Sequence, residues 1–161
     1  MATEIERQRY VVGFLFFGPN VVLLKKNRLQ WQAGLLNGVG GKIEPPETPL
    51  QAMDRKCTEE IGLSGISWNH FADLVGDDFV VHAFCAALDR WDERVPRLPR
   101  FNEVGEEVCL IRSELFCVVP HVANVPALVA LARVWPSFRF ATISYGVNGA
   151  ADQQAREERH G

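Results

Sequence analysis

The stretch GGKIEPPETPLQAMDRKCTEEIGL, residues 40–63, decides the fold of this chain. It joins a glycine run, a loop with two prolines and a segment with helical periodicity. Thr48 can cap a helix, Pro49 suits its first position, and Gln51 completes a capping box. The pattern therefore predicts a helix over residues 49–61.

Apolar residues recur along this helix at helical spacing, at Leu50, Met53, Cys57 and Ile61. They predict one face that packs on the core. Gly62 follows the last of them and is a natural C-terminal stop.

The charged residues of the helix gather on another face. Lys56, Glu59 and Glu60 stand at i, i+3 and i+4, and Arg55 can pair with Glu59. The four carboxylates near this face belong to Glu44, Glu47, Glu59 and Glu60. They repel one another, and a hard divalent cation such as Mg²⁺ or Mn²⁺ would relieve that repulsion. The alternative is a solvated charged face with no ligand.

Two shorter segments add candidate ligand contacts. The run Gly38-Val39-Gly40-Gly41 predicts a turn whose backbone approaches a ligand closely or adopts positive φ. The cationic segment at 25–28 follows a strand, and it is either a solvated turn or a contact to phosphate.

The rest of the chain predicts strands and one more helix. Apolar runs predict strands at 10–17, 21–24, within 66–75, and at 79–88, 108–111 and 138–145. The first two form a hairpin. A second helix is expected at 125–134 and a charged loop at 89–99. Strands and helices do not alternate regularly, so the fold class is α+β.

Composition narrows the functional classes. The 161 residues include 47% hydrophobic ones, and the net charge is −3. These values suit a single domain over 1–161 with loose tails at 1–8 and 150–161. Basic stretches are short, so no nucleic-acid partner is expected. No apolar run approaches the ~20 residues of a membrane span, and the polar N-terminus is unlike a signal peptide.

The four cysteines form no C-x-x-C pair, and three stand in apolar runs. They are expected to be reduced structural thiols, which suits the cytoplasm. Neither they nor the four histidines show the ligand spacing of a zinc site.

Residues 41–63 resemble the signature of the Nudix hydrolases, G-x5-E-x7-R-E-U-x-E-E-x-G-U, where U is aliphatic. The matching positions are Gly41, Glu47, Arg55, Glu59, Glu60 and Gly62. Lys56 stands where the family has its first glutamate after the arginine, and Cys57 takes an aliphatic place. The wider resemblance spans about 10–145.

This resemblance implies a mixed-sheet α/β/α sandwich with the signature as loop–helix–loop. It implies Mg²⁺-dependent cleavage, with Mn²⁺ as an alternative, of a nucleoside di- or triphosphate or a related nucleoside diphosphate derivative at a pyrophosphate linkage. The implied metal ligands are Glu59, Glu60, the carbonyl of Gly40 and an acid from the second half, for which Glu107 is the candidate and Glu103 and Glu106 are the alternatives. Glu47 and Arg55 would brace the loop on the helix.

The substrate is implied by residues 36–42, which resemble the branch that hydrolyses oxidised purine nucleotides such as 8-oxo-dGTP. There Asn37 would bind the base, with Gly41 and Lys42 also at the substrate. Lys56 supports an alternative, a Nudix-fold nucleotide-binding or regulatory module with weakened or lost catalysis. An interaction protein with a coincidental charged helix is a third reading. A homodimer stays open.

Overall fold

The long strand β1 (Gln8–Phe17) runs through the centre of the sheet in the computed structural model, which describes residues 6–28, 30–89 and 100–145. Its β-branched and aromatic residues suit burial on both faces. β2 (Asn20–Lys25) returns antiparallel to it, which confirms the predicted hairpin. β6 (Phe79–Leu88) lies parallel on its other side, with the bounds that the sequence predicts.

The remaining strands extend this centre into a mixed sheet with the order β7-β8-β2-β1-β6-β5-β9. Their bounds are Arg100–Phe101 for β7, Glu107–Arg112 for β8, Asn69–Val75 for β5 and Ala141–Ser144 for β9. β3 (Leu36–Asn37) pairs with β2. Two short 3-10 turns, Gln30–Gln32 and Ser113–Cys117, lie outside the sheet. β9 is shorter than the strand predicted at 138–145.

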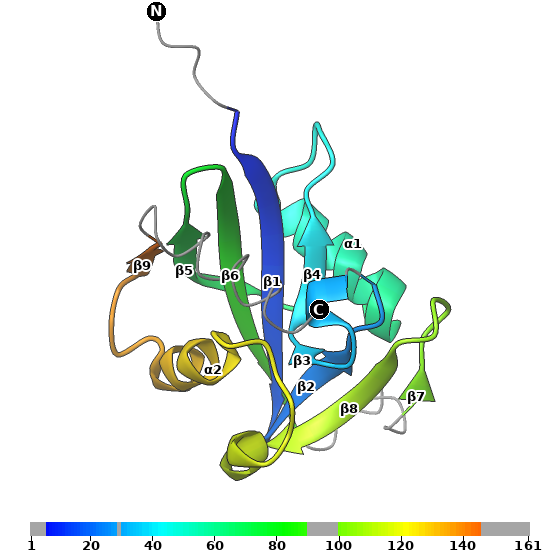
Figure 1. The fold of residues 1–161 in the computed structure, drawn as a ribbon. Coiled ribbons are helices and arrows are strands. Elements are labelled where there is room, and N and C mark those ends of the chain that lie inside the picture. Colours follow the sequence, from blue (N-terminus) through cyan, green and yellow to red (C-terminus); the bar gives the residue numbers. More distant parts are fainter. Residues whose placement is uncertain (1–5, 29, 90–99, 146–161) are drawn as a thin grey trace, which may run out of the picture.

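One helix covers each face of the sheet (Figure 1). Alternate residues of β1 point to opposite sides, so Val11 and Leu15 pack with α1 (Pro49–Ile61). Phe14 and Phe16 pack with α2 (Val125–Val134). This arrangement confirms the α+β class and the α/β/α sandwich.

The ends of α1 are set by local sequence, as predicted. The Thr48 hydroxyl oxygen accepts a hydrogen bond from the Gln51 backbone amide, and Gln51 Oε1 accepts one from the Thr48 backbone amide. Gly62 ends the helix in the left-handed conformation at φ 74°. The expected core position of Leu50 is wrong, because this side chain is 47% exposed. The buried residue of the first turn is Ala52, whose small side chain lets the helix start lie close to the core.

The glycine run is a strand, which corrects the predicted turn. Residues Val39–Lys42 form β4, antiparallel to β1. None of the glycines at positions 38, 40 and 41 has a positive φ. A Cβ on Gly40 would lie 2.0 Å from the carbonyl oxygen of Val11. Glycine is needed here because two backbones approach each other, rather than for a turn.

The structure also tests the expectations for the cysteines, the chain ends and membrane spans. Cys57, Cys85 and Cys109 are free thiols, as predicted. β1 already begins at Gln8, so this residue belongs to the sheet rather than to a tail. Residues 90–99 of the expected loop and the expected tail at 150–161 lie outside the described residues. In the described part, no helix is long and apolar enough to cross a membrane.

The contact at Gly40 predicts that Gly40→Ala lowers the free energy of unfolding by at least about 3 kcal/mol, as expected for overpacking. Urea denaturation measures this. Gly34→Ala is the control, because Gly34 has φ 81° and open space around it, so its cost is only the roughly 1–2 kcal/mol of backbone strain. Equal losses in the two variants would contradict the close approach.

Candidate active site

Arg55 joins the loop before α1 to the helix. Its Nε and Nη2 donate to the two carboxylate oxygens of Glu47 at 2.5 and 2.9 Å, a bidentate pair. Nη2 also donates to the carbonyl of Lys42 at 3.1 Å, and Glu47 accepts from the Glu44 amide at 3.0 Å. The structure therefore places Glu47 and Arg55 in the bracing arrangement that the resemblance implies. The hydrogen bond from Arg55 is the main cause that lowers the pKa of Glu47 to about 2.

Glu59 is half-exposed and lies between two cations. Arg55 Nη1 donates to its carboxylate at 3.2 Å, and Lys56 Nζ does so at 3.2 Å. Burial is the largest single influence and raises its pKa, but the bonds from Lys56 and Arg55 together outweigh burial. The pKa of Glu59 therefore lies below its ordinary value, and the group is ionised at neutral pH.

Glu60 is buried and connects α1 to two strands. Its Oε2 accepts from the Gly40 amide of β4 at 3.0 Å. Its Oε1 lies 3.4 Å from Lys26 Nζ, at the end of β2, and 3.4 Å from Lys56 Nζ. The N–H and C=O of one strand residue point to the same edge. The carbonyl of Gly40 therefore faces the same side as its amide, toward this carboxylate.

Lys26 is a site residue that the sequence analysis missed. Neither alternative given for segment 25–28 holds for it, because it is only 7% exposed and pairs with acids. The signal was in the alternation of β2: Val22 and Leu24 face α1, so a period of two puts Lys26 on that face too. Lys25 and Arg28 are exposed.

The acid that the structure brings to this group is Glu106. Its Oε2 lies 3.7 Å from Lys26 Nζ, and its side chain is buried. Glu107 is its neighbour in the chain, but it lies within β8, where it pairs with Lys25 of β2. Glu103 is exposed. Of the three candidates, Glu106 shares a partner with Glu60.

The expected substrate residues lie along β3 and β4. Asn37 Oδ1 accepts from the Gly38 amide at 2.8 Å, and its Nδ2 lies 3.5 Å from Gln32 Oε1. Gly41 leaves room for the stem of Lys56, since a Cβ there would lie 2.7 Å from Lys56 Cε. Lys42 is exposed and offers its ammonium to solvent.

The donor set fits an oxygen-preferring divalent cation. Glu59, Glu60, Glu106 and the Gly40 carbonyl offer only oxygen, the ligand that Mg²⁺ and Mn²⁺ prefer. The nearby thiol of Cys57 is no competitor, because burial raises its pKa to about 12. The ammonium of Lys56 already forms ion pairs with the carboxylates of Glu59 and Glu60. A bound cation would require this side chain, which is 19% exposed, to turn away.

Comparison with known proteins gives one family. The model of the NUDIX domain matches residues 7–116. The fold is similar to a Nudix hydrolase from Nitrosomonas europaea (TM-score 0.66, 17% identity, 87% of this chain and 80% of that chain). It is also similar to MutT studied in Aliivibrio salmonicida and Vibrio cholerae (0.62, 21%, 80% and 98%). A third similar structure is the NUDIX domain of Shewanella oneidensis NrtR with ADP ribose (0.66, 16%, 82% and 89%). A search of curated protein sequences gave no match.

The Arg55–Glu47 pair predicts a pH dependence of stability. The pKa of Glu47 is depressed in the folded protein, so its contribution is present above the ordinary value of 4.5 and is lost as the pH falls toward about 2. Thermal unfolding of Glu47→Gln should therefore show a lower midpoint at neutral pH and a shallower fall in this range. Glu44→Gln is the control, because Glu44 is largely exposed and lies 3.8 Å from Arg55. Parallel curves for Glu47→Gln and the parent would refute the assignment.

The burial of Lys26 predicts that Lys26→Met lowers the free energy of unfolding by about 3–5 kcal/mol, because it removes the cation that pairs with the buried Glu106 and leaves Glu60 with Lys56 alone. The neighbouring exposed lysine gives a matched control, Lys25→Met, which should stay within about 0.5 kcal/mol of the parent. Adding Glu106→Gln to Lys26→Met should restore part of the loss. If the two methionine variants unfold alike in urea, Lys26 does not neutralise the buried acids.

Proposed function

Because this chain belongs to the Nudix domain family, we propose that it hydrolyses a nucleoside diphosphate derivative at a pyrophosphate linkage, with Mg²⁺ or Mn²⁺ as the cofactor. The observation that carries this proposal is the series of ion pairs that links Glu59, Glu60 and Glu106 through Lys56 and Lys26. It lies beside a helix braced by Arg55 and Glu47. The bracing pair and the two helix acids stand at the family's motif positions.

The chain's own residues have separable tasks in this proposal. Arg55 and Glu47 hold the loop, so that residues 40–42 keep one position relative to α1. Glu60 is fixed by the Gly40 amide and by Lys26, so its carboxylate does not need to reorganise. Glu59 is ionised and half-exposed, which makes it the most accessible of the three acids proposed as metal ligands. The exposed ammonium of Lys42 offers a charge for phosphate oxygens.

A bound divalent cation would offset phosphate charge and activate the attacking water. It would be held by Glu59, Glu60, Glu106 and the carbonyl of Gly40.

Lys56 sets the strength of cation binding in this proposal. Its ammonium lies 3.2 Å from Glu59 and 3.4 Å from Glu60, so it neutralises the carboxylates that a metal would use. A free metal must displace this contact, which raises the metal concentration needed for turnover. The same contact favours the second candidate function, a binding module whose internal cations replace the metal and which holds a diphosphate without cleaving it.

Several classes of nucleotide are candidate substrates. The resemblance of residues 36–42 puts 8-oxo-dGTP and dGTP in the panel, and the ligand of the S. oneidensis domain adds ADP ribose. The amide of Asn37 already makes local contacts to Gly38 and Gln32. We therefore propose the pyrophosphate linkage, rather than a particular base, as the recognised feature.

The proposal predicts opposite effects for two variants in a turnover assay with this panel. Glu59→Gln should lower kcat by at least about 100-fold, the range expected when a charged active-site group is lost. Lys56→Glu should lower the Mg²⁺ concentration for half-maximal rate and raise kcat by about 10-fold or more.

Lys25→Glu is the matched control for Lys56→Glu, because it makes the same charge change at an exposed position of β2. It should leave the rate within about 2-fold. Absence of turnover by both the parent and Lys56→Glu with Mg²⁺ or Mn²⁺ would overturn the hydrolase proposal. Nucleotide binding retained in both would then favour the binding module.

A further inference from the structure

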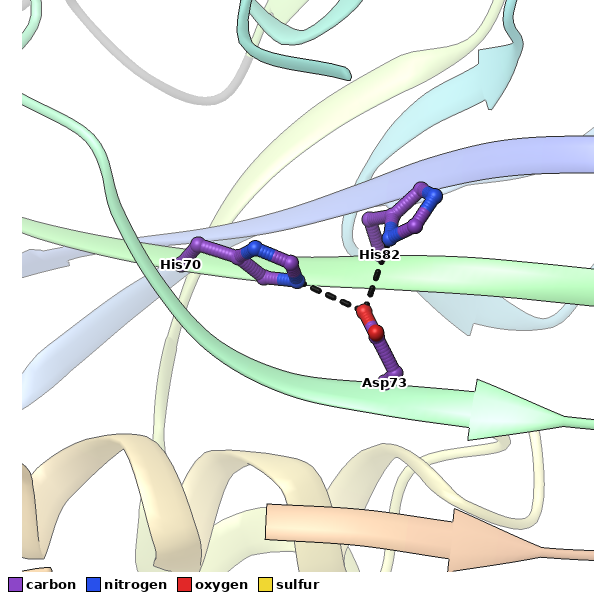
Figure 2. A group of neighbouring side chains, drawn as sticks. All are labelled: His70, Asp73 and His82. Atoms are coloured by element: carbon purple, nitrogen blue, oxygen red, sulfur yellow. Dashed lines mark hydrogen bonds and ion pairs between the residues drawn. The ribbon is translucent and has the colours of Figure 1, made fainter. Parts of the chain in front are cut away.

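A second group of ligand-type side chains lies on β5 and β6, and none of its members belongs to the signature. His70 and Asp73 come from β5 and His82 from β6 (Figure 2). One carboxylate oxygen, Asp73 Oδ1, lies 2.6 Å from His70 Nε2 and 2.8 Å from His82 Nδ1. The three ligand atoms all lie within 4.8 Å of one another. The sequence analysis expected no such group, because its histidines come from different strands.

A β-bulge creates this convergence. In a regular strand, residues three apart point to opposite faces. The register of β5 against β6 shifts between His70 and Ala72, which inserts one extra residue and turns His70 to the same face as Asp73. Asp73 and His82 are direct partners across the strands, so their side chains are neighbours.

Aromatic contacts hold the more exposed histidine in place. The ring of His70 stacks on Phe84 with the centroids 4.9 Å apart, and it forms a T-shaped pair with Phe140 with the centroids 5.0 Å apart. The His82 side chain is only 13% exposed. The rings therefore have fixed orientations, while the open side of His70 leaves a path for a small ion.

We propose that His70, Asp73 and His82 bind a divalent transition-metal ion of the zinc class. Two imidazoles and one carboxylate form a ligand set that suits such an ion, with water completing a tetrahedral shell. Hydrogen bonds of 2.6 and 2.8 Å now join the ligand atoms. Nitrogen and oxygen ligands about 2.0–2.2 Å from a zinc ion lie farther apart than this, so each side chain need open only slightly.

Arg9 is the cation that faces this group, and it opposes metal binding. Its Nη2 lies 3.5 Å from His82 Nε2. An arginine can only donate, so this contact requires a lone pair on Nε2 and a proton on Nδ1, which then donates to Asp73. Metal binding at Nδ1 displaces that proton. If the proton moves to Nε2, Arg9 must turn away.

A metal ion bound at this site would cross-link β5 and β6, and this role does not depend on the proposed hydrolysis. Its ligands come from both strands, so a bound ion cross-links them and stabilises the folded state by mass action. Mg²⁺ prefers oxygen ligands, which makes the two sites distinguishable by the metal that each takes.

The test is a Zn²⁺ titration against a chromophoric chelator, in excess Mg²⁺ to occupy oxygen-only sites. Zn²⁺ should bind the parent with a stoichiometry of one at this site and raise its thermal midpoint. Asp73→Asn, His82→Ala and His70→Ala should each weaken binding by at least about 10-fold, and Arg9→Ala should tighten it. Co²⁺ should give the visible absorption of a tetrahedral site in the parent and lose it in these three ligand variants.

His121→Ala is the matched control, because the ring of His121 bonds to the Val122 carbonyl, away from this group. It should bind Zn²⁺ like the parent. Glu59→Gln should do the same, since it alters only the signature site. His70 is exposed, so its variant is expected to fold even if His82→Ala does not. Unchanged Zn²⁺ affinity in His70→Ala and Asp73→Asn would overturn the proposal. A rise in nucleotide KM without a change in Zn²⁺ affinity would instead assign the group to substrate binding.

Discussion

The buried carboxylate of Glu60 is the constraint on which the signature region depends. A charge taken out of water is costly unless it is paired and hydrogen-bonded. Glu60 meets this requirement with the Gly40 amide and two ammonium groups, from Lys26 and Lys56. These partners come from β4, from the residue that follows β2, and from α1 itself. One side chain thereby ties the helix to two strands at the point where the candidate chemistry lies.

The acidic side chains of the signature region are neutralised by cationic side chains of the same chain. The acids Glu47, Glu59, Glu60 and Glu106 each have a cationic neighbour in Arg55, Lys56 or Lys26. The repulsion that suggested a metal from the sequence is therefore partly relieved by the chain's own cations. Lys56 changes the sign of one position in the motif and adds a competitor for its neighbours. The fold tolerates this because the long, flexible stem of lysine packs over Gly41 and reaches the carboxylates.

Local signals in the sequence were sufficient for local structure. Helix α1 was predicted residue for residue, because Thr48, Gln51 and Gly62 act on backbone groups within one turn. β6 and α2 were predicted to their ends for similar reasons of composition and length. Long-range pairing was not readable in the same way. The strand β4, the burial of Lys26 and the position of Glu106 depend on which strand lies beside which, and so does the group at His70, Asp73 and His82.

The bulge in β5 has a consequence for how this chain can vary. Side chains alternate along a strand, so the face that a residue occupies depends on the number of residues before it. The bulge accommodates one extra residue between His70 and Asp73, so removal of that residue would leave a regular strand in which the two still share a face. A single-codon deletion at the bulge would thus keep the three side chains on one face. In a relative whose strand is regular, the two corresponding ligands would stand two positions apart in the sequence instead of three.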